Sequence, residues 1–151
     1  MPSDEAIANR QKSMAILAAA PVETLTRAFE NYADIPAHDI VRAPEIGLVM
    51  ARGRMGGTGA PFNLGEVSVT RCVIRLKTGE AGSSYIMGRD KKKALQAAIF
   101  DALWQNPAHH ETIETTVLAP LAAAQEEERQ NVRAETAATK VDFFTMVRGE
   151  D

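Results

Sequence analysis

The strongest constraint on the fold of this chain is a change of hydrophobic periodicity near Glu45. From there to Gly53 small residues alternate with larger ones, the period of two that places successive side chains on opposite faces of a strand. On either side of this central segment, apolar residues recur at the three- and four-residue spacing of amphipathic helices. The chain therefore predicts an α+β fold, with a sheet in the middle and helices at both ends.

A small antiparallel β-meander of about three strands is expected over residues 45–88. The second strand spans about Glu66–Leu76, and Thr78-Gly79 suits a two-residue hairpin turn. Ser83–Met87 is then expected to return antiparallel. Neither face of the second strand is wholly apolar, so we expect both faces to be covered, one by the chain's own helices and the other by helices or a partner.

Residues 1–35 predict an N-terminal helical hairpin, two short helices joined near Pro21. A DNA-reading helix-turn-helix is disfavoured, because the second helix offers phosphates two acidic residues and one arginine.

Residues 90–140 predict the C-terminal helices, the first with Asp90 as its N-cap. Between Gln125 and Lys140 the only larger apolar residue is Val132, too little to be held by a core of its own. The apolar tail, residues 141–151, is expected either to reach a partner or to fold back on the sheet.

The composition indicates one ordinary domain over residues 1–151, with 45% hydrophobic and 25% charged residues. The single cysteine, Cys72, excludes an internal disulfide and a cysteine-rich zinc site. No apolar run is long enough to span a membrane, and the acidic start disfavours a signal peptide, so a cytoplasmic location is expected. Residues 40–93 hold ten Lys and Arg against four Asp and Glu, which suggests a surface that faces an anion or a partner.

A Gly-rich loop is expected over residues 53–65, which contain five of the ten glycines but match neither the P-loop nor GxGxxG spacing. It is interpreted either as a ligand- or partner-binding loop or as a flexible connector. Arg52 and Arg54 share one face of a strand, as do Arg71 and Arg75. These guanidinium groups either converge on an anion or form ion pairs with Glu45, Glu66 or a partner.

Two further motifs have open interpretations. Three lysines follow Asp90 in the first turn of a helix, either as part of an anion site or as a solvated basic turn. His110 and Glu114 have helical i,i+4 spacing, but two ligands are too few for a metal site. Cys72 is expected to pack inside a strand, and no self-contained catalytic set is present.

One long motif has a family resemblance. The run Arg52-Gly53-Arg54-Met55-Gly56-Gly57-Thr58-Gly59-Ala60-Pro61-Phe62-Asn63-Leu64-Gly65-Glu66, with Val69-Thr70-Arg71-Cys72 and Gly88-Arg89-Asp90-Lys91, resembles the PhnG family, the G subunits of the bacterial carbon-phosphorus lyase system. The resemblance covers the whole chain in length and element order, from a helical start with Arg10 to a close on Phe143 and Phe144.

The resemblance implies a subunit of alpha-D-ribose 1-methylphosphonate 5-triphosphate synthase in organic phosphonate catabolism. Such subunits act with the H, I and L subunits to displace adenine from MgATP with a phosphonate, and G, H, I and J form a core complex. Because the nucleosidase chemistry is attributed to the I subunit, this implies a transferase subunit that is inactive alone and binds no cofactor itself, with MgATP and phosphonate as substrates of the complex.

The alternative function is a non-catalytic structural adaptor of the core complex. Neither nucleic acid nor membrane is expected as a partner. No catalytic residue or metal ligand is assigned to this chain. The candidate ligand- or partner-binding residues are Arg52, Arg54, Gly56, Gly57, Thr58, Gly59, Asn63, Glu66, Arg71, Arg89 and Lys91.

Overall fold

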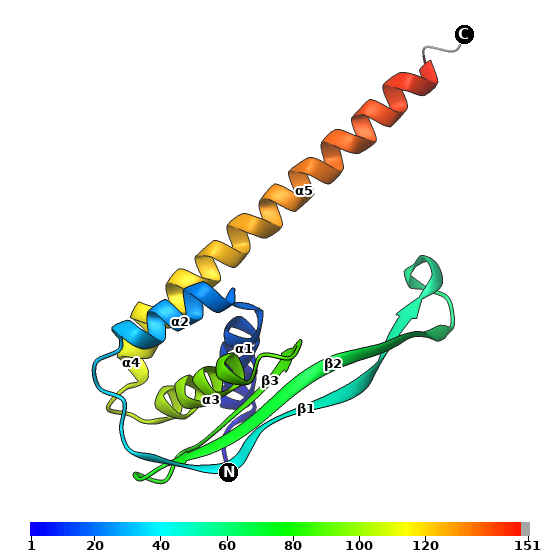
Figure 1. Ribbon diagram of the computed structural model, residues 1–151. Helices are drawn as coiled ribbons and strands as arrows, with labels where there is room; N and C mark the ends of the chain where they lie inside the picture. The colour runs from blue at the N-terminus through cyan, green and yellow to red at the C-terminus, as the bar shows by residue number, and fades with distance from the viewer. Residues whose placement is uncertain (149–151) are drawn as a thin grey trace.

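A computed structural model describes the backbone of residues 1–148, and the side chains of those residues except 55 and 140–148. Helices stand at both ends of the chain, and strands occupy the middle (Figure 1). In chain order the elements are α1 (Asp4–Ala19), α2 (Val22–Asn31), β1 (His38–Arg54), β2 (Pro61–Leu76), β3 (Ala81–Met87), α3 (Lys91–Gln105), α4 (His110–Ile113), a π-helical turn (Glu114–Leu118) and α5 (Ala119–Arg148). The predicted α+β class is confirmed.

The three strands form one antiparallel sheet in the order β1-β2-β3, the predicted meander. β1 begins at His38, earlier than the expected Glu45. The early part was missed because Pro44 lacks a backbone N–H and interrupts the alternation. The strand accommodates this residue with register shifts between Ile40 and Arg42 and between Arg42 and Glu45.

The expected Gly-rich loop over residues 53–65 is wrong in its extent, because Gly53, Arg54 and residues 61–65 belong to strands. β1 and β2 remain paired as far as Arg54 opposite Pro61, so only residues 55–60 form the connection. Gly56 and Gly57 have φ values of 61° and 77°, the left-handed conformation that the turn requires. Gly53, at the end of the expected alternation, lies in β1 under the Leu64 side chain, where its missing Cβ leaves the space.

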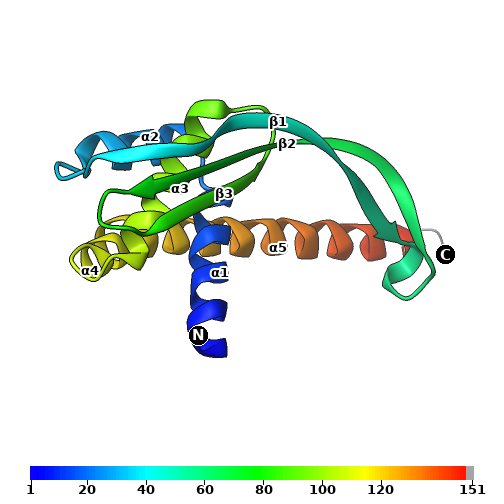
Figure 2. The same cartoon turned by 90° about the horizontal axis from the view of Figure 1, so that it is seen from below.

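Helices cover one face of the sheet, and the other face has no helix over it in the described chain (Figures 1 and 2). The covered face of β2 is buried at Cys72, Ile74 and Leu76, which pack against the alanine-rich side of α3. Arg71 and Tyr85 lie opposite each other on the uncovered face, and both are exposed. The sheet is thus amphipathic, and coverage of its second face by a partner stays a prediction.

The two N-terminal helices are present as expected and both contribute to the core. Leu17 of α1 and Leu25 of α2 are fully buried with Phe100 of α3. In Figures 1 and 2 the two helices cross steeply on either side of Pro21, so each packs on α3 instead of along the other.

The C-terminal helices form one helical run from α4 into α5. Pro120 has no N–H to donate four residues back, and its ring would clash with the preceding turn of a regular α-helix. The π-helical turn removes this conflict, since the Ala119 N–H donates five residues back, to Glu114. The expected boundary at residue 140 is absent, because α5 continues to Arg148; the side chains of the predicted apolar tail lie outside those described.

Most of α5 projects from the domain (Figure 1). Its last core residue is Leu121, and the described side chains from Glu126 to Thr139 are all exposed. The prediction of a polar stretch without a core of its own is therefore confirmed. No helix in residues 1–148 is both long and apolar enough to cross a membrane.

The closest contact between sheet and helix requires glycine at position 82. A Cβ built there would lie 1.9 Å from the Ala98 carbonyl oxygen and 2.7 Å from the Ala102 nitrogen. Gly82→Ala should therefore push β3 from α3 and lower the free energy of unfolding by about 1–3 kcal/mol or more. Denaturant unfolding of the full chain measures this.

Gly47→Ala is the matched control, because a Cβ there meets nothing within 4 Å. It should change the free energy of unfolding by no more than about 0.5 kcal/mol. Equal midpoints for the two variants would contradict the proposed close packing.

Candidate functional site

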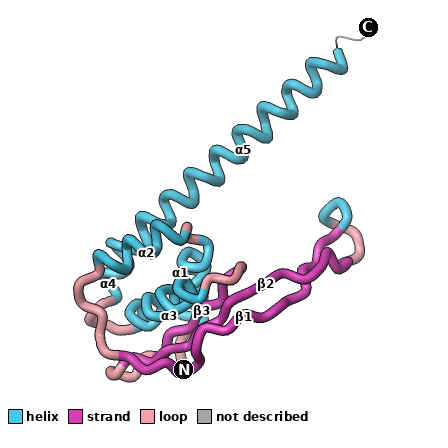
Figure 3. The backbone as a smooth tube through the Cα atoms, viewed as in Figure 1, coloured by secondary structure: helices cyan, strands magenta, loops and turns pink. Residues whose placement is uncertain are grey.

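The most prominent exposed feature is a two-stranded projection, here called the arm: residues 47–54 of β1, 61–68 of β2 and the connecting turn. β3 ends opposite Val69, so β1 and β2 continue beyond it as a ribbon (Figure 3). Four large apolar side chains of the arm are 42–64% exposed, namely Leu48, Met50, Phe62 and Leu64. An isolated two-stranded ribbon is marginally stable in water, so a surface of this kind is typical of a partner-binding element.

Most of the sequence-predicted candidates gather at the far end of this arm. Arg52 lies opposite Asn63, and Arg54 lies opposite Pro61. The turn between them contains Gly56, Gly57, Thr58 and Gly59. Glu66 lies further back on the arm, opposite Met50. The tip therefore presents two exposed arginines beside the backbone N–H groups of a glycine-rich turn.

Arg71 does not join this group. It lies opposite Glu45, and its guanidinium is 3.0 Å from that carboxylate. Glu45 is seven residues from Arg52 along β1, or about 23 Å at about 3.3 Å per residue. Convergence of Arg71 with the tip arginines is thus excluded by the register, and the ion-pair interpretation holds for Arg71.

Asp90 caps the basic first turn of α3, which contains the three lysines of residues 91–93. The Asp90 carboxylate accepts the Lys93 backbone N–H at 2.9 Å, so the helix start already has its own anionic cap. The Lys93 ammonium donates to the Ala18 carbonyl at 2.8 Å, at the end of α1. Burial lowers the pKa of Lys93, and the charge of Asp90 opposes that shift. Arg89 and Lys91 are exposed, an arrangement that favours a solvated turn over an anion site.

The two adjacent histidines, His109 and His110, each form a polar contact with another residue of the fold. His109 Nδ1 lies 2.6 Å from the Tyr32 hydroxyl, and His110 Nδ1 lies 2.6 Å from the Trp104 carbonyl oxygen. The Trp104 indole N–H donates to Glu114 at 2.6 Å. Among the described residues no three His, Cys, Asp or Glu side chains are placed to hold a metal ion.

Cys72 is fully buried in β2, facing the helices. Burial raises the pKa of its thiol, which disfavours the reactive thiolate. The prediction that Cys72 packs is confirmed.

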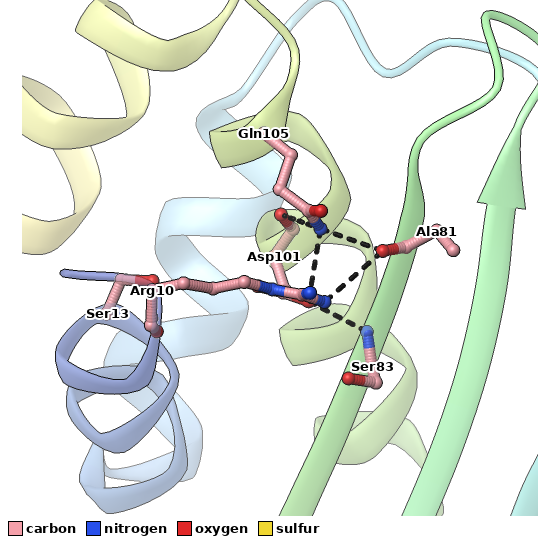
Figure 4. Close-up of polar contacts among 6 residues, drawn as sticks. All are labelled: Arg10, Ser13, Ala81, Ser83, Asp101 and Gln105. Carbon is pink, nitrogen blue, oxygen red and sulfur yellow. Dashed lines mark hydrogen bonds and ion pairs between the residues drawn. The ribbon is translucent and has the colours of Figure 1, made fainter. Parts of the chain in front are cut away.

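Sequence reasoning missed one buried charged cluster, centred on Asp101 of α3 (Figure 4). Its side chain is 0% exposed and accepts from the Arg10 Nε at 3.1 Å and Nη2 at 2.7 Å. The Ser83 backbone N–H donates to the same carboxylate at 2.9 Å. The Arg10 and Gln105 side chains also donate to the Ala81 carbonyl, at 3.3 and 2.7 Å. The hydrogen bonds to Asp101 raise the pKa of Arg10 against the opposing effect of partial burial.

This cluster joins α1, α3 and β3 and acts as a scaffold. A signal was present in the sequence, because Asp101 lies within the apolar stripe of α3, next to Ala102. A lone carboxylate there needs a cation, and the positions three and four residues away on α3 are Ala97, Ala98, Trp104 and Gln105, none of them basic.

Asp101→Ala should lower the free energy of unfolding by about 1–3 kcal/mol, because it leaves the Ser83 N–H without its acceptor and Arg10 without its carboxylate. Glu45→Ala is the matched control, since that carboxylate pairs with arginines on the exposed surface and should cost about 0–1 kcal/mol. Equal losses in urea titrations of the two variants would refute the scaffold role.

Two comparisons relate the chain to known proteins. The family model described as "Phosphonate metabolism protein PhnG" matches residues 8–149, which include the arm and all of α5. A protein of Rhizobium meliloti (strain 1021), named alpha-D-ribose 1-methylphosphonate 5-triphosphate synthase subunit PhnG, is 49% identical over 148 residues, 98% of this chain and 94% of that protein. The resemblance carried by the arm motif is confirmed: the chain belongs to the PhnG family of phosphonate metabolism proteins.

Proposed function

We propose that this chain is a subunit of alpha-D-ribose 1-methylphosphonate 5-triphosphate synthase in organic phosphonate catabolism. The observation that carries the proposal is the 49% identity, over nearly the full length of both proteins, to a protein with that name. In this proposal the chain acts in the cytoplasm with H, I and L subunits, and the complex displaces adenine from MgATP with a phosphonate. H, I and J are its partners in a core complex.

The geometry is consistent with a subunit that acts only in a complex. Two elements, the arm and the outer part of α5, extend from the domain without a core of their own. In this proposal the reaction belongs to the assembly, with MgATP as its substrate.

Within the complex, the arm tip is the part of this chain suited to contact the triphosphate. Its arginines have no acidic residue near them in sequence, since the segment between Glu45 and Glu66 contains none. Arginine forks bind phosphate oxygens through two parallel hydrogen bonds, and the glycine-rich turn lets the backbone approach closely.

The direct test is to co-express the H, I and L subunits with and without this chain, and to assay adenine release and ribose-phosphonate formation from MgATP and methylphosphonate. The proposal expects product only when this chain is present. A stable complex that makes product without it would refute a required role.

Arg54→Ala tests the arm tip. We expect the complex to assemble but adenine release to fall about 10- to 100-fold, the loss of about 1.5–3 kcal/mol from a hydrogen bond to a charged group. Arg75→Ala is the control, because Arg75 is exposed at the opposite end of the β1–β2 pairing. Loss of assembly with Arg54→Ala would instead make the tip a clamp on a partner.

The second candidate function, a structural adaptor, is favoured by the exposed length of α5. Truncation before Val141 should leave the unfolding midpoint of the isolated chain unchanged, because the described α5 side chains that lead to this segment, from Glu126 to Thr139, are all exposed. The same truncation should abolish co-purification with the larger subunits. If the shortened chain still assembles, the adaptor function through this segment is wrong.

A further inference from the structure

The sheet has two edge strands, β1 and β3, and each has unpaired backbone N–H and C=O groups along its outer edge. β3 has a short edge of seven residues, and its first carbonyl, that of Ala81, already accepts hydrogen bonds from Arg10 and Gln105. β1 has a long edge of seventeen residues, and among the described strands it pairs only with β2. Such a row of free N–H and C=O groups is a template for another strand.

The two halves of the β1 edge differ in how they are protected. The first half contains Pro44 and Arg42 and two register shifts, all devices that prevent edge-to-edge pairing. From Glu45 to Ala51 the register with β2 is unbroken, and Ile46–Ala51 contains neither proline nor a charged residue. This second half is the regular, uncharged edge that a protein left open to water would avoid.

The outer edge of β2 within the arm, beyond the end of β3, is also unpaired, but its irregular backbone and a charged residue protect it against strand addition. Gly65 has a φ of 142°, the register shifts between Ala51 and Arg52, and Glu66 places a charge beyond this irregularity. The unprotected edge is therefore confined to one side of the arm, along β1.

The side chains of this edge indicate what the occupant must be. Ile46, Leu48 and Met50 share one face of β1 and are 37%, 64% and 49% exposed. Ile46 lies opposite the buried Thr70, so this is the helix-facing side of the sheet, continued past the end of the helices. An added strand with alternating apolar residues would extend that face and place apolar side chains beside those of β1.

We infer that Ile46–Ala51 is an acceptor edge for β-strand addition and that its occupant is an extended segment of another synthase subunit, an inference that rests on the proposed function. Backbone hydrogen bonds would supply the affinity and the apolar alternation the specificity. Arg52 and Arg54 follow the edge at the arm tip, and no acidic residue lies between Glu45 and Glu66, so the added strand should have acidic residues at the end that lies beside the tip.

Amide hydrogen exchange of the full-length chain, alone and in the purified complex, tests the inference. In the complex, alternate amides of residues 46–51 should exchange at least about tenfold more slowly than in the isolated chain. Unchanged exchange in a complex that contains the chain would overturn strand addition while leaving the proposed function intact. Protection in the isolated chain that grows with concentration would make a second copy the occupant. Failure to form any complex would refute the proposed function itself.

A pair of proline variants separates edge pairing from contact through side chains. Neighbouring strand residues direct their N–H groups to opposite sides, so one of Val49→Pro and Met50→Pro removes a bond to β2 and the other removes an outward N–H. The outward variant should keep the unfolding midpoint of the isolated chain yet reduce complex yield at least about tenfold.

Leu64→Ala serves as the control, because Leu64 is 64% exposed on the β2 strand of the arm and lies outside the β1 edge. If Leu64→Ala reduces assembly while neither proline does, docking occurs through the arm's side chains and the inference is wrong. Should both prolines destabilise the isolated chain, the hydrogen-exchange result decides alone.

Discussion

The architecture depends on one buried carboxylate, that of Asp101. It lies in the middle of α3 and accepts hydrogen bonds from Arg10 of α1 and from the Ser83 N–H of β3. A carboxylate without exposure is costly unless it is fully paired, so its partners must be in place whenever the domain is folded. The same approach of β3 to α3 is possible only because residue 82 is glycine. Charge pairing and close packing thus fix the sheet on its helices at one point.

Two extensions of the domain, the arm and the outer part of α5, lie away from this buried cluster. The helices cover one face of the sheet and stop where the arm begins, and α5 leaves the core after Leu121. The chain therefore combines a well-packed domain with two extensions that have little to bury by themselves. Such extensions are favourable where another chain covers them, which agrees with membership in a family whose relative is named as a synthase subunit.

Several features followed directly from the sequence because their causes are local. The alternation after Glu45 predicted a strand, Asp90 was correctly taken as the N-cap of α3, and the polar stretch after Gln125 was correctly expected to lack a core. The errors have long-range causes. Glycines in residues 53–65 suggested a loop, yet Gly65 lies within β2, paired with Ala51 of the opposite strand. The partner of Asp101 could not be identified from the sequence, because its cation is 91 positions away in the chain.

The sequence by itself determined the α+β class, the meander and the family, because periodicity and a long motif are properties of short segments. The expected two-residue turn at Thr78-Gly79 is wrong by one residue, since the Leu76 N–H donates to the Glu80 carbonyl and leaves Lys77, Thr78 and Gly79 in the turn. Only the tertiary structure decided which candidate residues meet. The register of β1 against β2 places Arg52 and Arg54 at the tip of the arm and pairs Arg71 with Glu45. That register, and with it the open edge at Ile46–Ala51, depends on contacts between residues far apart in the chain. Local propensity carries no information about such contacts.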